Sequence, residues 1–230
     1  MPGRIRNMAK NVLHNPQQIN IAISQPAVGI DQQVYLVNDH QKSKLLQMIL
    51  KEGGFVSIII FASTKDKVKE VYKELKAAHL KINAFHSDLE QAEREDILLK
   101  FKNKQVPIII GTDALSRGID VEGIDLVVNY DAPGDPEDYI HRIGRTARAE
   151  TTGTAITFIN DRDQRKLKNI EDMMEREVRR IPLPEVLGDP TLIKMAPPKR
   201  DGGRGGNRSG GNNRNNNNRK PGGGDRHKKQ

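Results

Sequence analysis

The stretch IIIGTDALSRGIDVEGIDLVVNYD, residues 108–131, contains two apolar runs separated by a short polar segment. The runs III at 108–110 and LVV at 126–128 are apolar throughout instead of alternating, which is typical of strands buried on both faces of a parallel sheet. Thr112 and Asp113 follow the first run after a single glycine. The stretch therefore predicts two buried strands, with polar side chains at the point where the first one ends.

Strand-like and helix-like patterns alternate on both sides of this stretch. The predicted strands are 34–38, 56–61, 81–85, 106–110, 125–130 and 154–159, and the predicted helices are 44–51, 65–78, 90–102 and 161–177. Alternation of this kind predicts an α/β fold, an open and mostly parallel sheet with helices on both faces. In such sheets functional groups gather at the C-terminal ends of the strands. The two prolines of IPLPEVL, residues 181–187, are expected to end regular structure.

Composition divides the chain into a neutral body and a basic tail. The net charge is +8, and residues 199–230 hold ten Lys and Arg against two Asp, so this tail carries the whole excess. Because it has no Val, Ile, Leu, Met or Phe, it cannot offset the entropy of ordering and is predicted to be disordered. The predicted organisation is a helix and short strand at 1–24, a linker at 25–32, one domain at 33–187 and the tail at 188–230.

Several classes of site are excluded by composition. The chain has no cysteine, which excludes disulfides and thiolate zinc sites and fits a reducing compartment, so we expect a cytoplasmic location. Its apolar runs are far shorter than the roughly 20 residues of a membrane helix, so no membrane partner is expected. It contains no GxxxxGK[ST] phosphate loop and no Gly-Lys pair. No residue is predicted to bind a metal ion.

The segment YIHRIGRTARA, residues 139–149, carries the strongest functional pattern. On a helix His141, Arg145 and Arg148 would project from one face, within an arc of about 60°, and Gly144 beside them would allow a phosphate to come close. A solvated basic helix face is the alternative interpretation. That alternative does not account for the particular order HRxGRxxR.

This order resembles the sixth motif of the DEAD-box RNA helicases. The resemblance implies that Arg145 and Arg148 are arginine fingers that reach the γ-phosphate of ATP, and that His141 couples the ATP site to a second domain. The family usually has Gly where this chain has Ala147. The pair His141-Arg142 favours the RNA-dependent DEAD-box branch over related DNA helicases.

Residues 108–131 resemble the fifth motif of the same family. This resemblance implies that Thr112 and the pair Arg117-Gly118 meet the RNA backbone, while Gly118 and Asp120 line the ATP site, with Asp120 at the ribose. Hydroxyl and backbone N–H groups are natural phosphate partners, and a carboxylate is a natural acceptor for ribose hydroxyls. For Asp113, capping of the turn from strand to helix is the alternative.

Two weaker segments stand in the family's order. IIIFASTK, residues 58–65, resembles the fourth motif, which would place Ser63 and Thr64 on the RNA track, although Ser-Thr before a helix is equally an N-cap. HSDLEQAERE, residues 86–95, resembles the Gln-x-x-Arg element, which implies RNA contacts for Gln91 and Arg94. In the tail, arginines interleaved with Gly and Asn are predicted to bind RNA. They are Arg204, Arg208, Arg214 and Arg219.

Taken together, the resemblance implies a RecA-like C-terminal helicase domain. Its cofactors would be ATP and Mg²⁺, its partners RNA and a first helicase domain that holds the phosphates and the metal ion. The opening Met1-Pro2 is similar to the region just after the third motif, so residues 1–24 are expected to be a remnant of that first domain. Two alternatives remain open: an RNA-binding module without ATP chemistry, and the second domain of a helicase-like ATPase that acts on DNA.

Overall fold

The computed structural model describes residues 12, 26, 29–118, 123–146 and 152–188. The chain divides into two units, Met1–Ala196 and Pro197–Gln230, and all the described residues belong to the first. The remnant predicted at 1–24 and the tail predicted from 188 therefore lie almost entirely outside the described residues. Within the described part, no helix is both long enough and apolar enough to cross a membrane.

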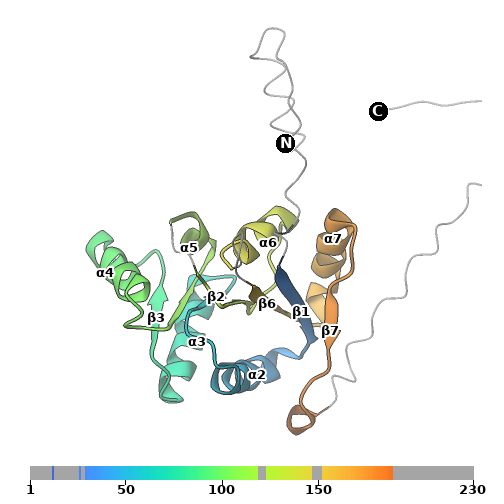
Figure 1. Ribbon diagram of the computed structural model, residues 1–230, viewed down its shortest axis with the longest axis horizontal. Helices are drawn as coiled ribbons and strands as arrows, with labels where there is room; N and C mark the ends of the chain where they lie inside the picture. The colour runs from blue at the N-terminus through green and yellow to red at the C-terminus, as the bar shows by residue number, and fades with distance from the viewer. Residues whose placement is uncertain (1–11, 13–25, 27–28, 119–122, 147–151, 189–230) are drawn as a thin grey trace, which may run out of the picture. The chain divides into compact units, whose positions relative to one another are not determined.

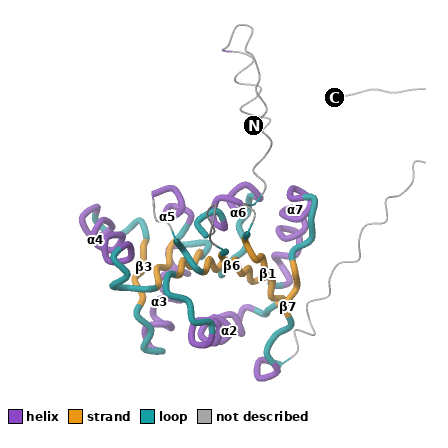
Figure 2. Tube along the Cα trace, viewed as in Figure 1, coloured by secondary structure: helices purple, strands orange, loops and turns teal. Residues whose placement is uncertain are grey.

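A single sheet of seven parallel strands forms the centre of the described domain (Figures 1 and 2). The strands are β1 (Ile30–Leu36), β2 (Ile58–Phe61), β3 (Ile82–Phe85), β4 (Ile108–Gly111), β5 (Leu126–Asn129), β6 (Gly153–Ile159) and β7 (Arg179–Ile181). Their order across the sheet is β3-β4-β2-β5-β6-β1-β7. Since all pairs are parallel, every strand ends at the same edge, called here the C-terminal edge, and begins at the opposite, N-terminal edge.

Helices cover both faces of the sheet. They are α2 (Asp39–Glu52), α3 (Lys65–Ala77), α4 (Gln91–Lys102), α5 (Asp113–Gly118), α6 (Pro136–Ile143) and α7 (Gln164–Met174), with 3-10 turns at η1 (Asp161–Asp163) and η2 (Glu185–Leu187). α2 and α3 lie on one face, and α5, α6 and α7 lie on the other (Figure 1). The α/β prediction with helices on both faces is confirmed.

Strand β2 shows why the apolar runs do not alternate. Ile58 and Ile60 pack into the cluster beneath α2 and α3, while Ile59 and Phe61 pack into the cluster formed with α4 and α5. Successive side chains point to opposite faces of a sheet, and here both faces are covered. All four residues are therefore buried.

Several element boundaries differ from the predicted ones; α2, for example, begins at Asp39 and not at residue 44. β1 begins at Ile30, so residues 30–32, predicted as the end of a linker, belong to the sheet. α7 ends at Met174 and not at residue 177, because Glu175 adopts a left-handed conformation with φ of 53° that stops the helix. β7 was not predicted. It has three residues, is the outermost strand of the sheet beside β1, and ends directly before Pro182.

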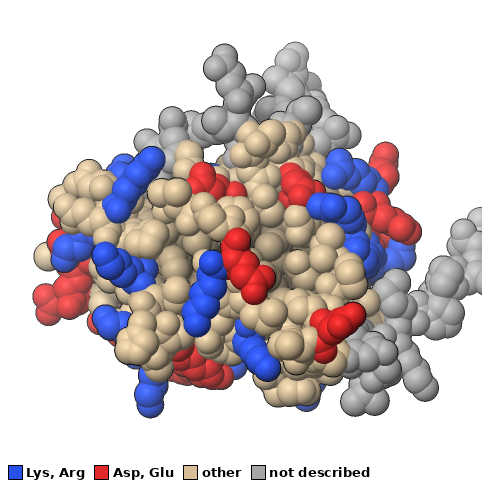
Figure 3. Space-filling view, turned by 60° about the horizontal axis from the view of Figure 1, so that its bottom comes forward, with Lys and Arg blue, Asp and Glu red and all other residues tan. Residues whose placement is uncertain are grey.

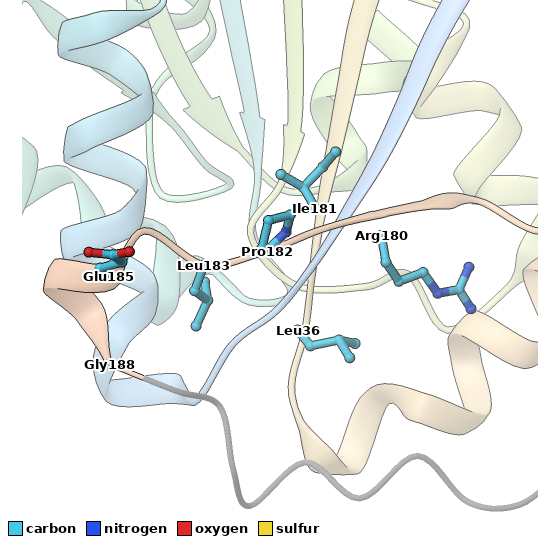
Figure 4. A pocket seen from close by; sticks show the side chains of 7 residues that line it. All are labelled: Leu36, Arg180, Ile181, Pro182, Leu183, Glu185 and Gly188. Atoms are coloured by element: carbon cyan, nitrogen blue, oxygen red, sulfur yellow. The ribbon is translucent and has the colours of Figure 1, made fainter.

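A groove lies at the end of β1 and β7 (Figure 4). Its lining residues are Leu36, Arg180, Ile181, Pro182, Leu183, Glu185 and Gly188. Among the residues that the structure describes, none predicted from the sequence to act on ATP or RNA belongs to this groove.

Candidate functional site

Helix α6 carries the HRIGR segment and ends earlier than the sequence suggests. Asp135 caps its N-terminus by accepting a hydrogen bond from the N–H of Glu137 (2.9 Å), and the helix ends at Ile143. The backbone then tightens, with the N–H of Arg145 bonded to the carbonyl of Arg142 at 3.2 Å. Arg145 thus lies in a turn after the helix, and the prediction that it shares a helix face with His141 is wrong. Arg148 lies outside the described residues.

The helix is fixed to the sheet by a buried arginine that the sequence analysis did not assign to the site. Arg142 is 2% exposed and forms a two-pronged ion pair with Asp113, at 2.6 Å from Nε and 3.0 Å from Nη2. Its Nη1 also donates to Asn129 Oδ1 at 3.2 Å and to the carbonyl of Asp131 at 3.0 Å. The guanidinium lies 5.1 Å from the centre of the Phe61 ring. We name these contacts the Arg142 clamp.

The clamp joins α6 to the C-terminal edge of the sheet. Asp113 begins α5 and is separated from the end of β4 only by Thr112, and Asn129 is the last residue of β5. Five guanidinium N–H donors in a fixed fork suit this task, because they can satisfy a carboxylate and two further oxygens at once. Capping of the turn from strand to helix does not fully account for Asp113, because its carboxylate is bound by Arg142.

A second buried cation meets the same edge from the other face. Lys42 on α2 is 2% exposed and contacts Asp131 at 3.2 Å and Asp39 at 2.9 Å. The other carboxylate oxygen of Asp131 accepts the backbone N–H of Ser63 at 2.9 Å. Burial is the main reason why the pKa of nearby Tyr130 is raised above its ordinary value, and neighbouring carboxylates add to it. Because Asp131 binds both Lys42 and the backbone of Ser63, it holds the turn after β2 in place.

The turn that contains Arg145 is held at the opposite edge. Thr146 forms a parallel bridge with Ile124, and its hydroxyl donates to the Ile124 carbonyl at 2.5 Å. Ile124 precedes β5, so this contact lies at the N-terminal edge, four residues after Asp120 in the sequence. Asp120 itself lies outside the described residues. The turn with Arg145, a residue predicted to act on ATP, therefore lies near the N-terminal edge, whereas functional groups were expected at the C-terminal edge.

The residues predicted to contact RNA follow three neighbouring strands at the C-terminal edge. Ser63 and Thr64 follow β2, and Thr112 follows β4. Gln91 and Arg94 stand in the first turn of α4, which comes after β3. Because β3, β4 and β2 are adjacent in the sheet, these five residues are brought to one region. Arg117 and Gly118 form the end of α5.

Some of these side chains have structural partners of their own. Gln91 donates to Glu95 at 2.8 Å, and Nη2 of Arg94 donates to the carbonyl of Ser87 at 2.9 Å. The hydroxyl of Thr64 accepts the N–H of Lys67 at 3.2 Å, so the N-cap interpretation of Thr64 is confirmed. His141 is exposed on α6.

Replacing Thr64 by alanine should destabilise the domain by about 1 kcal/mol, because the N–H of Lys67 loses its cap. Thermal or denaturant unfolding of the purified chain measures this. Thr152→Ala, at an exposed position before β6, is the matched control and should change stability by less than about 0.5 kcal/mol. Equal unfolding midpoints for Thr64→Ala and the unchanged chain would contradict a capping role.

Gly111 at the end of β4 has a packing reason in this chain. A Cβ at this position would lie 2.9 Å from the carbonyl of Phe85 and 3.1 Å from the side chain of Leu115. Strands β3 and β4 pair in register here, with Phe85 opposite Gly111. The glycine permits close approach of the two strands where Thr112 leaves the sheet.

Comparison with known proteins agrees with this arrangement. A family model described as the helicase conserved C-terminal domain matches residues 41–150. The DEAD-box ATP-dependent RNA helicase CshA of Geobacillus kaustophilus is 36% identical over 185 residues, which cover 80% of this chain and 40% of that protein. The chain thus spans less than half the length of this curated relative.

Two solved structures share the fold. Dbp5 of S. cerevisiae, in a structure bound to RNA and ADP BeF3, superposes with a TM-score of 0.73 and 28% identity, over 84% of this chain and 52% of that one. A structure of the C-terminal domain of the DEAD-box protein Dbp5 gives a TM-score of 0.62 and 31% identity, over 76% of this chain and 98% of that one.

The parallel sheet, its two helix layers and these matches define a RecA-like helicase domain. The chain belongs to the DEAD-box RNA helicase family and corresponds to its C-terminal helicase domain.

Proposed function

We propose that this chain is the second RecA-like domain of an ATP-dependent RNA helicase and supplies Arg145 and Arg148 to the ATP site. The observation that carries the proposal is the separation of two groups of residues on one rigid sheet. Arg145 lies in a turn fixed at the N-terminal edge by Thr146, whereas the predicted RNA residues follow strands at the C-terminal edge. One domain can thereby touch a nucleotide and a nucleic acid at different places.

The residues fit the triphosphate of ATP but do not fit Mg²⁺. Guanidinium groups bind phosphate oxygens with directed hydrogen bonds, and arginine keeps its charge at any physiological pH. No group of three or more His, Cys, Asp or Glu suited to a metal ion occurs among the residues that the structure describes. The metal ion and the inner phosphates are therefore assigned to a first helicase domain.

In this proposal the chain's own residues stabilise the charge on the γ-phosphate and fix the orientation of the nucleotide and of Arg145. ATP bound by the first domain supplies the phosphoryl group that is transferred to water. Arg145 and Arg148 neutralise charge that develops on the γ-phosphate, and Asp120 accepts a hydrogen bond from the ribose. The Arg142 clamp fixes α6, so that the turn after it presents Arg145 in one orientation. Dbp5, in the structure that resembles this chain, holds both RNA and ADP BeF3.

The test is ATP hydrolysis by the purified chain alone and by the chain together with a complete first domain. Alone, the chain should hydrolyse ATP no faster than buffer, because its sequence has no phosphate loop. With the first domain, RNA should stimulate turnover and DNA should not. RNA-stimulated turnover by the chain alone would overturn the proposed division, and equal stimulation by DNA would favour a DNA-dependent ATPase.

The basic tail is proposed to bind RNA independently of ATP, which is the specific basis of the alternative RNA-binding function. Residues 199–230 hold ten Lys and Arg, among them Arg204, Arg208, Arg214 and Arg219. We also propose a cytoplasmic location, supported by the absence of cysteine.

Truncation after Pro198 should weaken RNA binding and flatten its salt dependence. Each phosphate neutralised on a single strand contributes about −0.7 to the slope of log affinity against log salt, so ten basic residues contribute at most about −7. RNA affinity of the full and truncated chains is measured across a salt series. Coincident curves would make the tail a spacer and leave RNA binding to the folded domain.

A further inference from the structure

Two lysines of α3 converge on one carboxylate beside the predicted RNA residues. Lys65 Nζ lies 3.0 Å from Oδ1 of Asp88, and Lys69 Nζ lies 2.6 Å from Oδ2. Positions four apart on a helix lie on the same side, which explains the convergence. Both lysine side chains are about half exposed, at 49% and 48%, and Asp88 is 38% exposed. The three side chains form a surface group that we call the Asp88 cluster.

The cluster adjoins the predicted RNA track on two sides. Lys65 directly follows Thr64, the residue that caps α3 at the end of β2. Asp88 directly follows Ser87, whose carbonyl accepts the hydrogen bond from Arg94. The loop between β3 and α4 therefore has the lysine pair on one side and the predicted RNA residue Arg94 on the other.

The ratio of charges distinguishes this cluster from other exposed ion pairs of the domain. Lys67 pairs with Glu70, Lys100 with Asp96 and Lys168 with Asp172, one cation to one carboxylate in each case. The Asp88 cluster has two cations to one carboxylate. Basic and acidic side chains are interspersed on the face turned forward in Figure 3. Asp66 also acts electrostatically on Lys65, so the cluster is distinguished by one carboxylate that binds two ammonium groups and not by its net charge.

The donor count also favours a larger anion. Two ammonium groups offer six N–H donors, whereas the carboxylate of Asp88 has two oxygens to receive them. The pKa of Asp88 is lowered to about 2, first by the hydrogen bond from Lys69 and next by that from Lys65. A phosphodiester that enters between the lysines offers oxygens of its own and full negative charge. Such an anion can take both ammonium groups from Asp88.

We propose that Lys65 and Lys69 bind the phosphate backbone of single-stranded RNA, and that Asp88 is the counter-ion that the RNA displaces. The inference rests on the proposed function, because the neighbouring residues Thr64 and Arg94 are themselves predicted RNA contacts. Lys65 is the last residue of the segment that resembles the fourth motif, and the inference extends the RNA contact from there to Lys69, with Asp88 as counter-ion. Since lysine reads charge and not the sugar, the pair strengthens binding without adding a preference for sequence.

The test compares RNA affinity of the full chain with that of the double variant Lys65→Ala/Lys69→Ala, using fluorescently labelled oligo(U) across a salt series. Loss of two phosphate contacts should reduce the salt slope by about 1.4 and weaken binding by roughly ten- to sixtyfold at about 50 mM salt. The control is Lys100→Ala/Lys168→Ala, which removes the same charge from two other exposed ion pairs. Because salt screens distant charges, the control variant should weaken RNA binding by no more than about twofold.

The variant Asp88→Asn distinguishes two roles of Asp88: a counter-ion that competes with RNA for the lysines, and a residue that orients the lysines for RNA. If Asp88 competes with RNA, this variant should bind oligo(U) several-fold more tightly at low salt. Weaker binding, with an unchanged unfolding midpoint, would mean that Asp88 orients the lysines, and would overturn its assignment as a displaced counter-ion.

A titration of the Asp88 carboxyl by NMR checks the geometry itself. The midpoint should lie at about 2 in the unchanged chain and rise toward 3.8 in Lys65→Ala/Lys69→Ala, because the lysines stabilise the charged form. Since the folded pKa is the lower one, the ion pairs stabilise the fold above pH 3.8 and are lost as pH falls toward 2.

The failures of the two proposals are distinguishable. An unchanged chain that does not bind oligo(U) at low salt would overturn the proposed function. An unchanged chain that binds, with the lysine variant equal to its control, would overturn only the role of the lysine pair. The tail is present in every variant, so its contribution cancels in each comparison.

Discussion

An alanine at position 145 should slow ATP hydrolysis by about 10³- to 10⁵-fold when the chain acts with a first helicase domain, which corresponds to roughly 4–7 kcal/mol of barrier. The expectation follows from the chemistry of phosphoryl transfer, in which charge spreads over the γ-phosphate oxygens and a fixed guanidinium stabilises it. The turn that presents Arg145 is held by the Thr146 contact to Ile124. The measurement is RNA-stimulated kcat of the two-domain protein.

The control for this experiment is Arg165→Ala, which removes an exposed arginine from α7 and should leave kcat unchanged. RNA affinity of the Arg145→Ala protein should equal that of the unchanged protein, because Arg145 lies at the edge away from the predicted RNA residues. Unaltered turnover with Arg145→Ala would remove the arginine-finger role. Loss of RNA binding together with turnover would point to a damaged fold.

Replacing Asp113 by alanine should destabilise the domain by about 3–5 kcal/mol, the usual cost of leaving one partner of a buried ion pair without its counter-charge. Arg142 is 2% exposed and would keep its hydrogen bonds to Asn129 and the Asp131 carbonyl and its contact with the Phe61 ring, but no counter-charge from Asp113. Asp113 itself is 35% exposed, so the effect is expected at the lower end of that range. Denaturant unfolding of the full chain measures the difference.

An exposed pair provides the matched control. Arg179 reaches both carboxylate oxygens of Asp31 at 2.9 and 2.7 Å, as Arg142 does with Asp113, but both residues are about half exposed. Arg179→Ala should therefore cost less than about 1 kcal/mol. Similar losses for Arg179→Ala and Asp113→Ala would show that burial does not strengthen the clamp.

The sheet could be predicted because its signal is local and repeated. Runs such as Ile58–Phe61 are apolar on both faces only when both faces are covered, which fixes strand type, parallel pairing and the two helix layers. β7 escaped prediction because three residues, two of them arginine, carry no apolar pattern. Its pairing with β1 and the ion pair from Arg179 to Asp31 arise only in three dimensions.

Motif order proposed the candidate residues, among them Thr64, Thr112 and Arg145, and their functional roles stay predictions. The spacing of His141, Arg145 and Arg148 implied one continuous helix after residue 139. The helix ends at Ile143 instead, because the backbone at Gly144 tightens and Thr146 bonds to Ile124. Arg142 was missed as a clamp since its partners lie 29, 13 and 11 residues away, which no local pattern reveals.

The place of β1 in the sheet governs when the domain can fold during synthesis. β1 is the first strand among the described residues, yet its neighbours are β6 and β7, with Ile30 opposite Gly153. Until the ribosome has released β6, both hydrogen-bonding edges of β1 are open, and unpaired backbone groups along a strand are a template for pairing with other chains. Closing such a distant pair is slow compared with local contacts. Nascent chains that stop short of residue 153 should therefore aggregate, and those that extend past residue 181 should not.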